Sequence, residues 1–269
     1  MLLRFGKMHC LGDDLMLVEL LGQYAQIDAG LIREWASRVH GVGFRRLVLV
    51  GIPQHPDADF DCRSFDRQGH ELDSRFTDLC CAARMLHDRR LSNQPELRMQ
   101  TRNGCLPVHV REDGWVAVRY AQELWPQPQA GVELPAAVQG FLQELMQRHG
   151  LAVEWMLAGQ QLVLWSRQAP PQRLARLLQP VSGRLRGWQV FWLHAEDEAV
   201  RVQFWQSDAE SAGHDPCLLA VSGLQGRISR PVVQVGWQQE HLLVDFLPGQ
   251  DAIQLFARAH RVYEGQIRL

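Results

Sequence analysis

Cysteine, histidine and lysine side chains carry much of the nucleophilic and proton-transfer chemistry of proteins, and this chain has six cysteines, eleven histidines and one lysine. The cysteines form neither C-x-x-C pairs nor a regular framework, and the adjacent Cys80 and Cys81 would point in different directions from a helix. Cysteines without such spacing are usually buried in the core, where they pack as small hydrophobic residues. The histidines also lack the spacing of metal ligands, so we expect no metal site.

Lys7, the only lysine, limits which cofactors the chain could use. An internal Schiff base, as in pyridoxal-phosphate racemisation, would depend on this one residue. We therefore expect no such cofactor.

Charge and hydropathy exclude several classes of partner. The formal net charge is -2 and both signs are spread along the chain, which argues against a nucleic-acid footprint. The longest apolar runs, such as Leu47 to Ile52, are too short to span a bilayer. The opening MLLRFGKMHC lacks a signal-peptide core. We expect a cytoplasmic protein with no nucleic-acid and no membrane partner.

Strand and helix patterns alternate twice along the chain. In the first half, strand-like runs surround helical spacing over 29–39 and 77–90, and short strands follow to residue 120. The proline-rich segment 125–135 is a candidate linker. The order then repeats, with helical spacing over 136–149 and 170–179 and a short helix from Asp215. This predicts an α/β protein of two similar lobes.

Four blocks resemble the diaminopimelate epimerase family, most closely its pseudomonad-like gammaproteobacterial members. They are KMHCLGDDLMLVE from Lys7, HGVGFRRLVLV from His40, DFDCRSFDRQGHELD from Asp59 and RVYEGQIRL from Arg261. The resemblance runs from Met1 to about Tyr120, weakens between roughly 121 and 155, and then continues to the end.

The resemblance implies an α/β (α+β) fold of two pseudo-symmetric lobes, each a curled, mainly antiparallel sheet around a central helix. It implies an N-terminal lobe of residues 1–120 with the C-terminal strand 262–269, and a second lobe of 121–261. It also implies a homodimer that uses no cofactor. In the family, two cysteines, one at the N-terminus of each central helix, exchange a proton at the substrate's α-carbon.

The matching positions in this chain hold other residues. A gapless count from Gly69 places the first cysteine at Arg75, and the anchor Glu210 places the second at His214. The positions of the family's asparagines give the candidate binding residues Asp13, Asp66, Gln160 and Gln189. Its two helix-initiating turns give Thr77, Asp78 and Asp215, and the anchor Glu210 is a further candidate.

These exchanges remove the chemistry that the resemblance implies. The guanidinium of Arg75 stays protonated and cannot act as a base. His214 can exchange a proton near neutral pH, but it would act alone. Thr77 or Asp78, and Asp215, are good N-cap residues, so a ligand carboxylate would meet a protein carboxylate in place of open amides.

Other interpretations of single residues remain open. Cys80 or Cys81 could replace the missing thiol after a slip in alignment, and Cys217 could lie near His214. Arg75 could hold an anionic ligand or pair internally with an aspartate, Asp78 or Asp215; we favour the internal pair.

Three functions compete. The first is a non-catalytic relative of the epimerase that binds a small anionic or amino-acid ligand, or pairs with itself or an active epimerase. The second is an isomerase or lyase that uses His214 in one-base chemistry and Arg75 to hold a carboxylate. The third is residual diaminopimelate epimerase activity in lysine biosynthesis.

Overall fold

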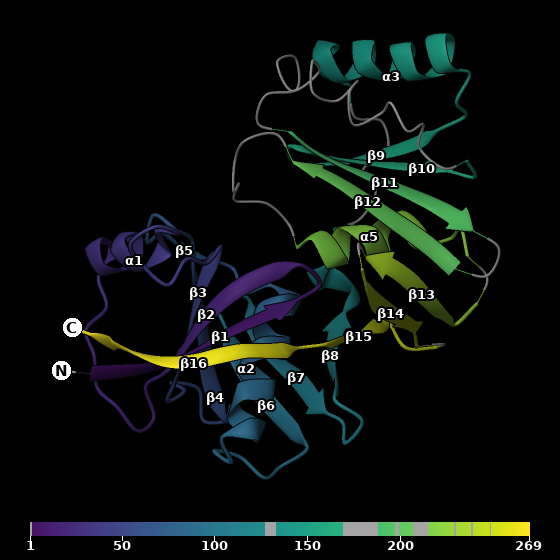
Figure 1. Cartoon of the computed structure of the whole chain (residues 1–269). Coiled ribbons are helices and arrows are strands. Elements are labelled where there is room, and N and C mark those ends of the chain that lie inside the picture. The colour runs from purple at the N-terminus through teal and green to yellow at the C-terminus, as the bar shows by residue number, and fades with distance from the viewer. Residues whose placement is uncertain are drawn as a thin grey trace. The chain divides into compact units, whose positions relative to one another are not determined.

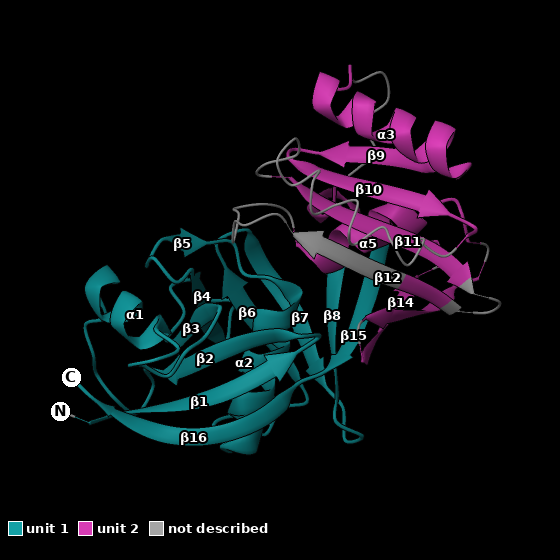
Figure 2. Ribbon diagram, turned by 45° about the horizontal axis from the view of Figure 1, so that its top comes forward, with its two compact units in different colours: residues 1–120, 252–269 teal, residues 121–251 magenta. Residues whose placement is uncertain are grey.

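Two compact units make up the chain in the computed structural model, which describes residues 2–126, 133–168, 188–196, 199–206, 215–228, 230–237, 239–247 and 249–269. Unit 1 contains residues 1–120 and 252–269, and unit 2 contains residues 121–251 (Figures 1 and 2). The segment that returns to unit 1 therefore starts at Ala252 and holds two strands, where the resemblance implies only the last one.

Unit 1 is a curled sheet around one helix. Its elements are β1 (Leu2–Cys10), β2 (Asp13–Glu19), α1 (Ala29–Ala36), β3 (Arg46–Gly51), β4 (Phe60–Phe65), β5 (Glu71–Leu72), α2 (Phe76–Asp88), β6 (Glu96–Thr101), β7 (Gly104–Val110), β8 (Trp115–Ala121), β15 (Ala252–Arg258) and β16 (His260–Arg268). Its strands lie in the order β16-β1-β2-β3-β4-β6-β7-β8-β15.

Helix α2 lies inside this sheet. It contacts strands from both halves of the strand order: β1, β2, β3, β4, β7 and β15. Ten of its 13 residues are buried, including both faces around Leu79 to Ala83. A helix that is apolar on all sides needs neighbours on all sides, which the curled sheet provides.

Helix α1 covers the outer face of the same sheet. It begins at the N-cap Asp28, whose side chain accepts a hydrogen bond from the Leu31 N–H at 2.9 Å. Its buried Ile32 and Trp35 join a core with Phe44 of the loop that follows and with Leu3 of β1.

The strands of unit 2 carry helices on both faces. Its elements are η1, a 3-10 turn (Gln122–Leu124), α3 (Ala136–His149), β9 (Glu154–Ala158), β10 (Gln161–Ser166), β11 (Gln189–Glu196), β12 (Ala199–Gln206), α5 (Pro216–Leu224), β13 (Val232–Trp237) and β14 (Glu240–Phe246). The expected helix over 170–179 lies outside the described residues.

The alternation of side chains along β10 and β11 explains why unit 2 needs two helices. Leu162 and Trp192 share a core cluster with Phe141 of α3. Their neighbours Val163 and Leu193 point the other way, toward α5, where they approach Gly223. Both faces of these central strands are therefore buried.

The two units repeat one pairing pattern. In unit 1 the successive pairs β1–β2, β2–β3, β3–β4, β4–β6 and β6–β7 are antiparallel, parallel, antiparallel, parallel and antiparallel. The pairs β9–β10, β10–β11, β11–β12, β12–β13 and β13–β14 of unit 2 follow the same sequence. Helices α2 and α5 occupy equivalent places in it. The predicted α/β class with repeated lobes is confirmed.

Within the described ranges, no helix combines the length and the apolar character that crossing a membrane would require.

Candidate functional site

The first turn of α2 is fixed by its own side chains. Arg75 is the N-cap, with extended backbone angles, and Asp78 is the third residue of the helix. The Asp78 carboxylate accepts a hydrogen bond from the Arg75 N–H at 2.9 Å. An arginine side chain offers no acceptor in return, so only this half of a capping box is formed. The sequence favours Thr77 or Asp78 as the N-cap; the helix instead begins earlier because Asp78 reaches back to Arg75.

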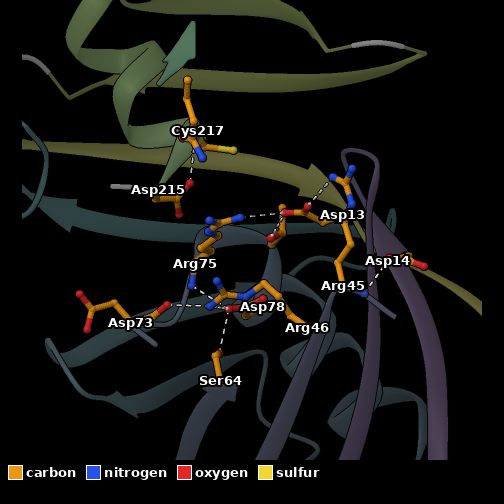
Figure 3. Close-up of polar contacts among 12 residues, drawn as sticks. Asp13, Asp14, Arg45, Arg46, Ser64, Asp73, Arg75, Asp78, Asp215 and Cys217 are labelled. Atoms are coloured by element: carbon orange, nitrogen blue, oxygen red, sulfur yellow. Dashed lines mark hydrogen bonds and ion pairs between the residues drawn. The ribbon is translucent and has the colours of Figure 1, made fainter. Parts of the chain in front are cut away.

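Asp78 is also the centre of a buried polar network (Figure 3). Its Oδ2 lies 2.7 Å from Nη2 of Arg46 and accepts from the Ser64 hydroxyl at 2.8 Å. Arg46 also donates to the backbone carbonyl of Asp73 at 2.7 Å. The Asp78 side chain is 0% exposed and that of Arg46 is 5% exposed. Since β3 and β4 supply the partners, the network attaches the start of α2 to the sheet.

Asp13 lies beside this helix start, at the beginning of β2. Its Oδ2 accepts from the Thr77 hydroxyl at 3.1 Å and lies 4.0 Å from Nη1 of Arg75. Its Oδ1 lies 3.6 Å from Nη1 of Arg45. Both arginine contacts are longer than the 2.7–2.9 Å of a strong charge-assisted hydrogen bond. Within the described part of the chain, each guanidinium therefore keeps N–H donors that no strong hydrogen bond occupies.

Asp14, the next residue, holds a second group of cations. Its Oδ2 contacts Lys7 at 3.0 Å and Arg38 at 2.9 Å, and its Oδ1 accepts from the Arg45 N–H. Burial on its own raises the pKa of the Asp14 carboxyl, but the hydrogen bonds and charges of Lys7 and Arg38 outweigh burial and lower it overall. Burial also lowers the pKa of Lys7, although Asp14 opposes the shift.

The ion pairs around Asp13 and Asp14 leave a positive excess. They involve two carboxylates and four cationic side chains: Lys7, Arg38, Arg45 and Arg75. The side chains of Arg38 and Arg45 are about half exposed, at 58% and 49%. This edge of unit 1 can therefore attract an anion.

Other candidate residues have local structural contacts. Asp66 shapes the turn after β4, where it accepts from the N–H groups of Gln68 and His70. Gln160 is exposed in the turn between β9 and β10, and its carbonyl accepts from the Gln189 N–H. The Gln189 side chain accepts from Gln161 at 2.6 Å inside unit 2.

Asp215 is the N-cap of α5, as predicted, and accepts from the Cys217 N–H at 2.8 Å, with Pro216 in the first turn (Figure 3). His214 and Glu210 lie outside the described residues, so the structure does not bear on their predicted roles.

The thiols of α2 are poorly placed to replace a catalytic cysteine. Cys80 and Cys81 are 0% exposed and lie past the first turn. Burial raises the pKa of the Cys81 thiol, and the neighbouring Cys10 raises it further. A buried thiol with a raised pKa stays protonated near neutral pH.

Sequence reasoning identified Arg75 but missed the other arginines of this site, Arg38, Arg45 and Arg46. Arg46 opens the apolar run RLVLVG yet points into the protein, which signals a buried acidic partner. The partners Asp78 and Ser64 are distant in sequence, so local spacing could not identify them. Arg75 does make an internal contact, but the packing of α2 against β2 brings Asp13, 4.0 Å away, to its guanidinium, whereas Asp78 accepts only from its N–H. The alternative pair with Asp215 stays a prediction.

Comparison with known proteins identifies relatives of the chain by sequence. No family model matches it. It is 30% identical over 294 aligned positions to the diaminopimelate epimerase of Pseudomonas paraeruginosa and 31% identical over 290 to that of Azotobacter vinelandii, in each case with complete coverage of both chains.

Solved structures share its fold. A phenazine biosynthesis protein of the PhzF family from Enterococcus faecalis aligns with a TM-score of 0.70 at 11% identity over 100% of both chains. A hydroxyproline epimerase from Agrobacterium vitis with bound trans-4-hydroxy-L-proline aligns with a TM-score of 0.62 at 13% identity, over 99% of this chain and 91% of that one. The identity and complete coverage of the curated relatives mean that this chain belongs to the diaminopimelate epimerase family.

Proposed function

We propose that this protein uses the epimerase scaffold to bind a small anionic or amino-acid ligand and does not catalyse two-cysteine epimerisation. The observation that carries the proposal is the start of α2, where Arg75 is the N-cap and the carboxylate of Asp78 lies within the first turn.

The chemistry of Arg75 supports the loss of epimerisation. Inverting a carbon centre by two bases requires a group on each face that can both take up and release a proton. A guanidinium remains protonated at physiological pH and cannot take one up. The buried Cys81, with its raised thiol pKa, is no substitute.

The first turn of α2 also has little capacity for a substrate carboxylate. A helix N-terminus binds anions through open N–H groups and its dipole. Here Phe76 and Asp78 are 0% exposed and Thr77 is 3% exposed, and the Asp78 carboxylate accepts from the Arg75 N–H. A second carboxylate at this turn would meet like charge.

The arginines beside the turn offer a different way to hold an anion. Arg45 and Arg75 flank Asp13 at 3.6 and 4.0 Å, and each retains N–H donors. We propose that a ligand carboxylate binds to the N–H donors of these two guanidinium groups that point away from Asp13. In this role the protein acts in the cytoplasm as a homodimer or as a partner of an active epimerase.

Proton exchange in deuterated water tests the catalytic half of the proposal. The protein is incubated with diaminopimelate stereoisomers, beside the epimerase of Pseudomonas aeruginosa, and the α-proton is followed by NMR. We expect no exchange. Exchange with inversion would overturn the proposal. Exchange without inversion would instead support one-base chemistry, which His214→Ala should then abolish.

Calorimetric titration with diaminopimelate tests the binding half. We expect Arg45→Ala to weaken binding by about tenfold, because one charge-assisted contact is lost. Arg148→Ala is the matched control, since Arg148 is an exposed arginine of unit 2 that, among the described residues, pairs with its helix neighbour Glu144. Equal affinities of the wild type and Arg45→Ala would contradict the proposed ligand position.

A further inference from the structure

A cavity lies in unit 1 at the end of α2 that is opposite the candidate site. Its volume is about 470 Å³, within the range of small-molecule sites. Arg4 and Phe5 of β1, Glu19 of β2, Arg89 and Leu91 after α2, and Glu264 of β16 contribute to its walls. The cavity therefore combines two guanidinium groups, two carboxylates and an apolar wall.

Glu19 positions the two arginines without saturating them. Its side chain is 3% exposed, and its Oε2 accepts from the N–H groups of Leu21 and Gly22 at 3.1 and 3.0 Å. Its Oε1 lies 3.5 Å from Arg4 and 3.9 Å from Arg89. The backbone N–H groups occupy Oε2, and both guanidinium groups lie near Oε1 at distances longer than that of a strong charge-assisted hydrogen bond.

Arg89 lies in the wall of this cavity with most of its side chain covered. Its side chain is 17% exposed, and its Nε donates to Oε1 of Glu264 at 3.1 Å. Its Nη1 lies 3.9 Å from Oε1 of Glu19, a longer distance than that of a strong charge-assisted hydrogen bond. A carboxylate placed between Arg4 and Arg89 would accept from N–H groups of both.

The same cavity can also accept a positive charge. The side chain of Glu264 is 45% exposed, and the contacts that the described residues make with it, from Arg89 and Arg261, both fall on Oε1. Its Oε2 is thus available to an ammonium group. The C-terminus of α2, which ends at Asp88, adds a partial negative charge at this end of the helix.

We propose that this cavity binds a small α-amino acid with an aliphatic side chain. The carboxylate contacts Arg4 and Arg89, the ammonium contacts Glu264, and the side chain packs on Phe5 and Leu91. The residues differ from those of the proposed ligand site at the start of α2, so the two proposals stand or fall separately.

Titration calorimetry with three probes tests the charge pattern. The probes are L-leucine, isocaproate, which lacks the ammonium group, and isoamylamine, which lacks the carboxylate. We expect L-leucine to bind at least about tenfold more tightly than either analogue, since each analogue loses one charged contact. No heat with millimolar L-leucine, or equal affinities for L-leucine and isocaproate, would overturn the proposal.

Two variants assign the contacts to residues. The side chain of Arg4 is 58% exposed and contributes little to folding, so Arg4→Ala should lower only the affinities for L-leucine and isocaproate. Glu264→Gln should lower the affinities for L-leucine and isoamylamine but leave the affinity for isocaproate unchanged. Arg111→Ala, an exposed arginine paired with Asp113, is the control. If Arg4→Ala or Glu264→Gln binds L-leucine as the wild type does, the proposed site is wrong.

Discussion

The buried charge of Asp78 at the start of α2 is stabilised by three hydrogen-bond donors that contact the same carboxylate oxygen. Arg46, Ser64 and the Arg75 N–H all converge on Oδ2 of Asp78. The other oxygen, Oδ1, and the Arg46 Nε have no hydrogen-bond partner within the described part of the chain. The network therefore depends on a single oxygen atom, which makes Asp78 the most sensitive member.

We expect Asp78→Ala to lower the free energy of unfolding by about 3–5 kcal/mol, because it leaves the Arg46 guanidinium buried without its counter-charge. Urea denaturation measures the loss. Arg148→Ala, which breaks an ion pair whose arginine is 76% exposed, should cost only about 0.3–0.5 kcal/mol. A loss at Asp78 no larger than in this control would mean that the network contributes nothing.

The lowered pKa of Asp14 makes the free energy of unfolding depend on pH in the acidic range. Its folded-state pKa is lowered from the ordinary value of 3.8, so folding favours the ionised form. The resulting stabilisation is fully present above that ordinary value and is lost as the pH falls through the folded-state pKa. Asp14→Asn removes this contribution. The gap in free energy of unfolding between wild type and Asp14→Asn should be constant at neutral pH and narrow below pH 3.8. A gap that persists in acid would show that the contribution of Asp14 is not ionic.

At the scale of elements, hydrophobic periodicity predicted the helices of the two units but not the ion pairs between elements. Helical spacing over 77–90 predicts the central helix, which spans Phe76–Asp88, and Asp215 correctly marks the start of α5. Apolar period depends on local sequence, which is why these elements were found. The ion pairs of Arg75 with Asp13 and of Arg46 with Asp78 depend on the packing of α2 against β2 and β3, which are distant in sequence, so no local pattern indicates them.

Gly223 determines how closely α5 packs on its sheet. A Cβ at this position would lie 2.3 Å from Leu193 Cδ1 and 2.9 Å from Val163 Cγ1. We expect Gly223→Ala to destabilise the protein by about 1–3 kcal/mol through overpacking, despite the better helix propensity of alanine. Gly140, on the exposed side of α3 with nothing within 4 Å, is the matched control. Gly140→Ala should stabilise by about 0.5–1 kcal/mol. Thermal denaturation of both variants checks the opposite signs; the same sign at both sites would refute the packing argument.

At the scale of the whole molecule, the chain path makes unit 1 depend on its last residues. Unit 2 is one continuous segment, whereas unit 1 receives β15 and β16 only after the chain has passed through unit 2. Strand β16 pairs antiparallel with β1 from Leu2↔Arg268 to His9↔His260. β1 in turn contacts α2, so the C-terminal strand supports the sheet around the candidate site.

Removal of residues 260–269 should therefore weaken unit 1 selectively. β1 would lose one of its two partners and become an edge strand with unpaired backbone groups, while the pairs from β9 to β14 keep theirs. Hydrogen exchange followed by mass spectrometry compares the truncated and full-length chains. We expect faster exchange in peptides from β1 and β2 and unchanged exchange in those from β10 and β11. Equal loss of protection in both units would mean that they unfold as one cooperative body, and unchanged protection of β1 would mean that β16 adds no stability.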